Sequence, residues 1–389
     1  MRILYISWSI PPSPTGSATV ARGVSEIFSS AEMVICGEQP DFDSSFLADP
    51  EINRYVYLTH DLKWPRRGKR FLRWTRWLNF PFFFRKLYKL YKAENCDVIF
   101  VVYPDEYYLT GAWLLSRVVK DKFYVWYHNA YLENFHGTRK LYARWLQSKV
   151  FRDANITYTI SAGLSNYMET NYPQRAFPVL PHFVTLSKWD NNSEKESIII
   201  RSTRTTIRLL LLGSLNKSCL DAVVRICKTI KGTSKYQMDI YSGTPKWVFE
   251  KYGCLSPNVQ LCDYLPEDNL RGLIKTYQIA ILPLGLTGGL ADIEYQTIFP
   301  TRAVDLICSG LPIIAHVPKD SYIADFLTLH DCAEIVTEPN SLSLLGALEK
   351  LSCDVSRCKQ LSLNALAVAE KFDNVNLKNL LLNDFIIKK

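Results

Sequence analysis

Short apolar runs alternate along the chain with longer stretches in which apolar residues recur at helical spacing. The run at 97–103 (DVIFVVY) is apolar after its first residue and rich in β-branched and aromatic side chains, which is typical of a strand buried on both faces of a parallel sheet. The same pattern predicts strands at 2–10, 97–103, 123–127, 156–160, 209–212, 238–241, 259–262, 279–282 and 311–315. Strands separated by helices indicate an α/β fold with doubly wound parallel sheets.

The alternation of strand and helix stops and restarts in the middle of the chain. A length of 389 residues exceeds what one hydrophobic core usually holds, so we expect two domains. The polar stretch at 187–206 is the expected linker between Rossmann-like domains at 1–186 and 207–371, and 372–389 is expected to be a closing helix that crosses back to the first domain. Two such domains would hold a ligand in a cleft, at the strand ends of both.

The composition is that of a globular protein, with 48% hydrophobic and 22% charged residues. The ten cysteines form no CxxC pair and several lie in apolar runs, which favours buried thiols and a reducing, cytoplasmic location. The apolar start could be taken for a signal peptide, but it is short and three prolines follow, so we expect a strand, a loop and a helix. No apolar segment approaches the ~20 residues that span a bilayer.

One segment makes this protein basic. Residues 63–92 hold eleven Lys and Arg and no Asp or Glu, whereas the whole chain has a net charge of +8. Tryptophans lie among the arginines in its first part, a pattern typical of a helix in the interface of an anionic membrane. We do not expect nucleic acid as a partner, because no known binding module surrounds the charge. The expected membrane contacts are Trp64, Arg66, Arg67, Arg70, Arg73, Trp74 and Trp77.

The segment 297–316 (TIFPTRAVDLICSGLPIIAH) predicts an approach loop, a helix, a tight stop and a buried strand. Thr301 is expected to cap the helix, and the free N–H groups and dipole of a helix start attract anions. Arg302 adds a fork of donors suited to phosphate, and Asp305, one turn on, could bind a sugar diol. The alternative is an ordinary helix–strand unit with a surface Arg and Asp.

Several loops that follow predicted strands carry further candidates. Gly16 and Ser17 could bring backbone close to a ligand, although the GxGxxG fingerprint of dinucleotide-binding proteins is absent. Gly213 and Lys217 repeat this arrangement in the second half, where lysine can meet a phosphate as a point charge. His128 follows a strand and could deprotonate a bound hydroxyl, or it could be structural. Gly288 and Gly289 lie in a glycine loop just before the segment at 297–316.

Together these residues resemble the family 4 glycosyltransferases of the GT-B fold. The likeness includes RILYISWSIPPSPTG, ANITYTISAGLSNYM, LLLLGSLNKS and, most specifically, FPTRAVDLICSGLPIIA. The resemblance implies that the second half binds a nucleotide-sugar donor and the first half a glycan or lipid-linked acceptor. It also implies that Lys217 and Arg302 neutralise the diphosphate and that Asp305 holds the ribose hydroxyls. The family often has two glutamates eight positions apart, where this chain has Thr297 and Asp305.

Preorganised donors stabilise a diphosphate leaving group where its charge develops, so this chemistry needs no metal and no cofactor besides the nucleotide-sugar. No convincing DxD pair of carboxylates is present, and we expect metal-independent transfer. The resemblance implies retention at the anomeric carbon. Two alternatives are a sugar-nucleotide epimerase of the same fold and a non-catalytic, membrane-associated assembly partner.

Overall fold

The computed structural model of the chain describes residues 1–39, 55–60, 76–189, 206–263, 265, 267–286 and 290–387. It divides into two compact units. Unit 1 comprises residues 1–181 together with 374–389, and unit 2 comprises residues 182–373. No helix within the described ranges is long and apolar enough to cross a membrane.

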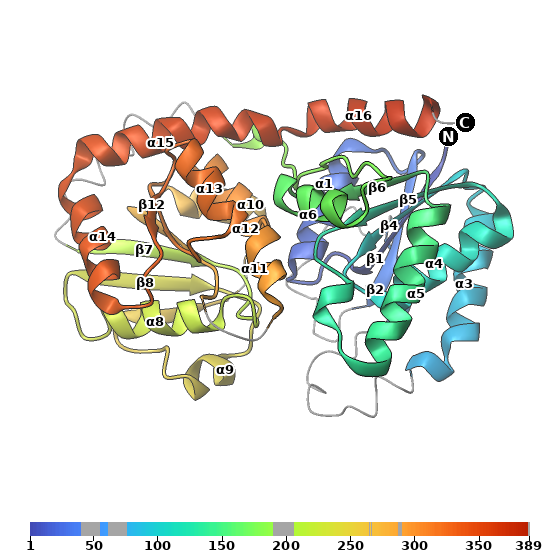
Figure 1. Cartoon of the computed structure of the whole chain (residues 1–389). Helices are drawn as coiled ribbons and strands as arrows, with labels where there is room; N and C mark the ends of the chain where they lie inside the picture. The colour runs from blue at the N-terminus through green and yellow to red at the C-terminus, as the bar shows by residue number, and fades with distance from the viewer. Residues whose placement is uncertain are drawn as a thin grey trace. The chain divides into compact units, whose positions relative to one another are not determined.

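Unit 1 is built on a parallel six-stranded sheet in the order β3-β2-β1-β4-β5-β6 (Figure 1). All six residues of β4, in the middle of the sheet, are buried, as the apolar run predicts. The strands are β1 (Ile3–Ser9), β2 (Met33–Gln39), β3 (Tyr55–His60), β4 (Val98–Tyr103), β5 (Lys122–Tyr127) and β6 (Ile156–Thr159).

Three helices of unit 1, α1, α4 and α6, begin soon after a strand ends, and each has a polar cap. The side chains of Thr15, Asp105 and Ser161 accept hydrogen bonds from free backbone N–H groups of the helices they precede. The helices are α1 (Gly16–Ile27), α3 (Phe80–Ala93), α4 (Glu106–Val119), α5 (Gly137–Asp153), α6 (Ala162–Asn171) and α16 (Asn374–Ile387).

The last helix, α16, belongs to unit 1 although it follows unit 2 in the sequence. Its Phe385 ring packs against Phe100 and Tyr124 of the sheet. Its Asp384 carboxylate accepts a hydrogen bond of 2.7 Å from the Tyr158 hydroxyl. The helix is therefore held by both apolar and polar contacts.

Unit 2 repeats the plan, with a parallel six-stranded sheet in the order β12-β11-β10-β7-β8-β9. One hydrophobic cluster lies on each face of this sheet. The strands are β7 (Ile207–Leu212), β8 (Tyr236–Tyr241), β9 (Val259–Cys262), β10 (Ile279–Pro283), β11 (Ile313–His316) and β12 (Glu334–Val336). The helices are α8 (Leu220–Ile230), α9 (Lys246–Lys251), α10 (Glu267–Ile274), α11 (Asp292–Thr297), α12 (Thr301–Cys308), α13 (Tyr322–Leu329), α14 (Ser341–Cys353) and α15 (Val355–Ala369).

The strand order defines where ligands bind in sheets of this kind. In each sheet the order reverses beside the first strand, between β1 and β4 in unit 1 and between β7 and β10 in unit 2. Ligands of doubly wound sheets bind at the carboxyl ends of the strands, next to such a reversal. The predicted fold class of two doubly wound α/β sheets is confirmed, and it locates one candidate edge on each unit.

Candidate functional site

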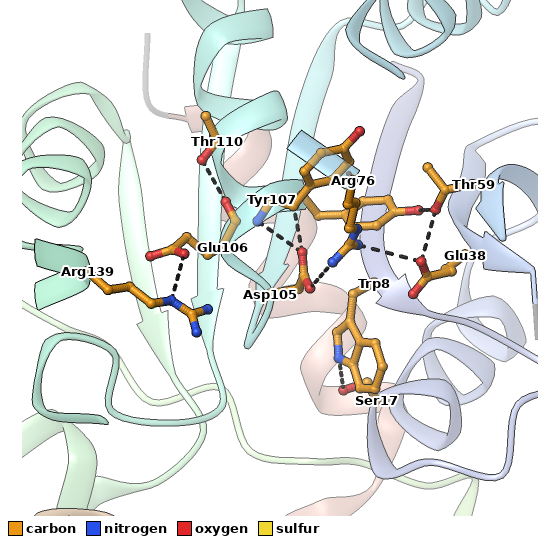
Figure 2. Close-up of polar contacts among 11 residues, drawn as sticks. Trp8, Ser17, Glu38, Thr59, Arg76, Asp105, Glu106, Tyr107, Thr110 and Arg139 are labelled. Carbon is orange, nitrogen blue, oxygen red and sulfur yellow. Dashed lines mark hydrogen bonds and ion pairs between the residues drawn. The ribbon is translucent and has the colours of Figure 1, made fainter. Parts of the chain in front are cut away.

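The carboxyl edge of the unit 1 sheet carries a cluster of charged side chains (Figure 2). Glu38 lies near the end of β2 and Thr59 near the end of β3. Asp105 and Glu106 follow β4, at the point where α4 begins. Figure 2 shows Arg76 between Glu38 and Asp105, and Arg139 on the Glu106 side. Residues distant in the sequence therefore meet where a ligand of unit 1 is expected.

Arg76 links the ends of β2 and β4. Its Nη1 atom donates to Asp105 Oδ2 at 2.8 Å, and its Nη2 atom lies 3.7 Å from Glu38 Oε1. The guanidinium also lies 4.4 Å from the centroid of the Tyr107 ring, a cation–π distance. Burial lowers the pKa of Arg76, but the carboxylates of Asp105 and Glu38 raise it more, so its pKa is raised overall and it stays protonated.

A second carboxylate–arginine pair starts at the next residue. Glu106 is buried and accepts hydrogen bonds from the Tyr131 hydroxyl at 2.8 Å and from Arg139 Nε at 3.2 Å. Burial raises the pKa of Glu106, while the bond from Tyr131 and the charge of Arg139 act in the opposite direction. These two donors are the kind of partners that a buried carboxylate needs.

The other unit 1 residues predicted from the sequence lie at the same edge. Gly16 is the exposed first residue of α1, where helix N–H groups lack partners. Ser17 is buried, and its hydroxyl accepts a bond of 3.1 Å from the Trp8 indole. His128 follows β5 and is buried, with its ring against Trp126 and its backbone N–H donating to the Tyr103 carbonyl.

In unit 2, Gly213 and Arg302 form one structure at the end of β7. Gly213 has a φ of +99°, and a Cβ there would lie 3.2 Å from the Arg302 guanidinium carbon. Arg302 donates from Nη1 to the Leu212 carbonyl at 3.0 Å and from Nη2 to the Ser214 carbonyl at 3.4 Å. Arg302 therefore supports the backbone of this loop, a contact that the sequence did not predict.

The remaining donor candidates of unit 2 are only partly as expected. Thr301 was predicted to cap α12, which is wrong: Pro300 is the capping residue, and no side chain accepts a hydrogen bond there. Asp305 is half-buried, one turn into the helix. Lys217 is exposed, and its ammonium group forms no ion pair or hydrogen bond within the described part of the chain.

Sequence reasoning missed a polar network around a buried histidine at the carboxyl edge of unit 2. His316, at the end of β11, is fully buried, and its Nε2 atom lies 2.8 Å from Arg225 Nη1. Its Nδ1 atom lies 2.9 Å from the Val336 carbonyl, so Nδ1 carries the hydrogen and Nε2 accepts from the arginine. Arg225 also pairs with Asp221, which accepts from the backbone N–H of Leu286 at 3.0 Å. These hydrogen bonds fix the loop that follows β10.

Some predicted residues lie outside the described residues: Gly288, Gly289, Trp64, Arg66, Arg67, Arg70, Arg73 and Trp74. Trp77 is described, and its expected contact with a membrane stays a prediction. Its ring is half-buried and packs against Phe80, Tyr107 and Tyr142, with centroids 5.3 to 5.8 Å apart. The ring therefore contacts residues of helices α3, α4 and α5.

In unit 1 the sequence analysis missed Glu38, Arg76, Asp105 and Glu106. Asp105 had a usable signal, because an aspartate between a buried strand and a helical stretch is a typical helix cap. No feature of the sequence distinguishes Arg76, since it is one of eleven Lys and Arg residues in the segment 63–92. Only the folded chain shows which of them is turned inward.

No protein-family model and no curated protein sequence matches the chain. Its fold is similar to that of several solved structures. HepE from Anabaena, in complex with UDP and glucose, is 14% identical, with 98% of each chain covered and a TM-score of 0.70. Sucrose-phosphate synthase from Thermosynechococcus elongatus is 10% identical, with 98% of each chain covered and a TM-score of 0.69. A glycosyltransferase from Rickettsia africae is 11% identical, with 99% of this chain and 97% of the other covered and a TM-score of 0.64.

These structures have the GT-B fold of glycosyltransferases, and at such low identities they establish the fold alone. The chain has this fold, with a Rossmann-like sheet in each unit. The fold class agrees with the resemblance of its motifs.

Proposed function

We propose that this chain is a glycosyltransferase that moves a sugar from a nucleotide-sugar to a glycan or lipid-linked acceptor. The observation that carries the proposal is the loop after β7, where Gly213 has a left-handed conformation, Arg302 bonds to the backbone carbonyls on either side of it and Lys217 is exposed nearby in sequence. Solved structures of the same fold include complexes with UDP and with UDP-glucose. The fold and the loop together support a diphosphate site on unit 2.

In this proposal some residues stabilise the charge that develops during the reaction and others bind the substrates. The glycine loop and Lys217 stabilise the diphosphate as the bond to the sugar breaks, so no metal is required. Asp305 holds ribose hydroxyls, and Gly16 and Ser17 lie near the donor phosphates or the acceptor. His128 binds or deprotonates the attacking hydroxyl of the acceptor. Transfer with retention remains an expectation from the family resemblance.

Donor binding is tested by the heat stability of the full chain with a panel of UDP-, GDP- and ADP-sugars. One of them is expected to raise the melting temperature, because a ligand that binds only the folded state stabilises it. Lys217→Ala is expected to weaken that binding about tenfold, the loss of one charge–phosphate contact, without changing the melting temperature of the free protein.

Lys231→Ala is the matched control, since Lys231 is also exposed but lies at the opposite end of α8. A donor site on unit 2 is refuted when no nucleotide-sugar shifts the melting temperature. Equal binding by Lys217→Ala and wild type would remove Lys217 from the site. Product that forms from the donor without any acceptor would indicate an epimerase instead of a transferase.

We also propose a cytoplasmic location with contact to an anionic membrane surface. Leu78, just before α3, and Phe82, in the first turn of α3, are 78% and 68% exposed, which is unusual for large apolar side chains. Arg85, Lys86 and Lys89 are exposed on the same helix. Apolar and basic side chains together suit the interface of an anionic bilayer. All ten cysteines are free, which is compatible with a reducing compartment.

Vesicles that contain anionic lipid are expected to sediment the protein at low salt and to release it at high salt, because salt screens surface charges. Phe82→Ser is expected to reduce the bound fraction, whereas Leu329→Ser, which removes an equally exposed apolar side chain in unit 2, leaves it unchanged. Equal sedimentation with neutral vesicles would contradict the proposal.

A further inference from the structure

We infer that Glu106 is a positioning residue that holds the His128 loop, defined here as residues 128–136, in place. The inference deepens the proposed function, because it matters for catalysis only where His128 acts on the acceptor hydroxyl. Glu106 is the first residue of α4 and His128 follows β5, the strand next to β4, so the two lie after neighbouring strands of the sheet.

The two side chains that donate to the Glu106 carboxylate belong to this loop and to the helix that directly follows it. The Tyr131 hydroxyl, three residues beyond His128, donates to Oε1 at 2.8 Å. Arg139, in the first turn of α5, donates to Oε2 at 3.2 Å (Figure 2). The Arg139 guanidinium also lies 4.0 Å from the Phe135 ring centroid. Glu106 therefore holds the loop near its middle and at its far end.

The near end of the loop is fixed by the strand that leads into Glu106. The Tyr103 carbonyl, at the end of β4, accepts the backbone N–H of His128 at 3.2 Å. The Tyr103 ring lies 4.6 Å from the Tyr131 ring. Residues 103–106 thus contact the His128 loop at its start, its middle and its end.

A buried carboxylate is a costly way to fill space, since an apolar side chain of similar size would need no hydrogen-bond partners. The carboxylate adds directional hydrogen bonds. Its two oxygens accept from two donors, and this fixes the position of the loop relative to α4. A histidine that transfers a proton depends on such precision, because a misplacement of about 1 Å can lower a rate about a hundredfold.

The test uses the full chain and three variants. Tyr131→Phe removes the hydroxyl and keeps the ring, and Glu106→Gln removes the charge and keeps the size. Tyr142→Phe is the matched control, because its hydroxyl bonds to Thr110 of α4 at 2.9 Å but lies outside the loop. The readout is the NMR spectrum of labelled histidine rings, with the His128 signal assigned from His128→Asn.

Tyr131→Phe and Glu106→Gln are expected to move the His128 signal and to leave in place the signals of the four histidines outside the loop, His60, His182, His316 and His330. With the donor and acceptor found by the screen above, kcat is expected to fall about tenfold while the KM for the donor is unchanged. Tyr142→Phe is expected to change neither. An unmoved His128 signal in both variants would overturn the inference.

The failure of this inference is distinguishable from that of the proposed function. Full activity of His128→Asn would refute the catalytic role of His128, even where the His128 signal moves in the other two variants. An inactive His128→Asn together with normal kcat in Tyr131→Phe and Glu106→Gln would refute only the positioning role. A melting temperature that falls without any change in kcat would show a purely structural role for Glu106 and would also overturn the inference.

Discussion

The two units share one sheet plan but differ in what they place at the carboxyl edge. Unit 1 presents charged side chains that pair with each other: Glu38 and Asp105 with Arg76, and Glu106 with Arg139. In unit 2, Arg302 beside the first strand bonds to backbone carbonyl groups instead of a carboxylate, and the ion pair of Arg225 with Asp221 lies elsewhere on the same edge. The same topology therefore supports two kinds of surface, and the difference lies in the loops, where function usually resides.

The difference suits two kinds of ligand. Side-chain carboxylates and hydroxyls accept and donate hydrogen bonds in set directions, which fits the hydroxyl groups of an acceptor. A loop with an exposed lysine offers positive charge, which fits a diphosphate. The predictions below test whether this division between the units holds.

The largest effect is expected for Arg76→Met in unit 1. The change leaves Glu38 and Asp105, both largely buried, without their shared cation. Breaking a buried ion pair on one side typically costs about 3 kcal/mol, so the free energy of unfolding should fall by that amount in urea titrations.

The control is Arg152→Met, which also removes an arginine paired with a carboxylate, that of Asp153, but from an exposed position. No measurable change in stability is expected there. Equal losses of stability in the two variants would mean that the burial of the Arg76 ion pairs has no energetic consequence. The proposed difference between the carboxyl edges of the two units would then be smaller.

The next effect concerns unit 2 and pH. His182 is fully buried, and neither ring nitrogen has a hydrogen-bond partner within the described ranges. Burial lowers the pKa of His182 from 6.5 to about 4, so the unfolded chain binds this proton more tightly than the folded one. The associated stability is present above pH 6.5 and is lost as pH falls towards 4, by up to about 3 kcal/mol.

His182→Phe removes this titration, and urea unfolding should then depend less on pH between 6.5 and 4. His136→Gln, at an exposed position, is the control and should keep the pH dependence of the wild type. A pH profile of His182→Phe that matches the wild type would show that other groups cause the loss of stability in acid.

The smallest change in stability, but the most direct test of unit 2, is Gly213→Ala. A side chain in this left-handed conformation costs about 1 kcal/mol. Its Cβ would also press on the Arg302 guanidinium at 3.2 Å. We expect the heat shift by the nucleotide-sugar to be lost, because the loop that Arg302 supports is displaced.

Gly232→Ala is matched to it, since Gly232 has a φ of +78° and no atom within 4 Å of an added Cβ. Gly232→Ala should lower the free energy of unfolding by a similar amount, and the nucleotide-sugar should still raise its melting temperature. Loss of donor binding in both variants, or in neither, would contradict the proposal that the Gly213 loop forms part of the donor site.

Much of the fold could be predicted from the sequence, because buried parallel strands are read directly from apolar runs such as the one at 97–103. The candidate site was predicted less completely. Gly213 and Lys217 could be selected as candidates because a loop after a strand has a recognisable composition. The contacts of Arg302 and Trp77 were not predicted. A long side chain can bond to backbone, face solvent or pack on another ring, and which of these it does depends on neighbours that are distant in the sequence.

The sequence by itself determined the two α/β sheets, because the period and length of apolar runs reflect local geometry and burial. Only the tertiary structure decided which charges are paired. Arg76 meets Glu38 and Asp105 because β2 and α4 bring their ends together across the sheet, 38 and 29 residues away along the chain. Coulomb and hydrogen-bond energies depend on such distances in space, and composition does not encode them.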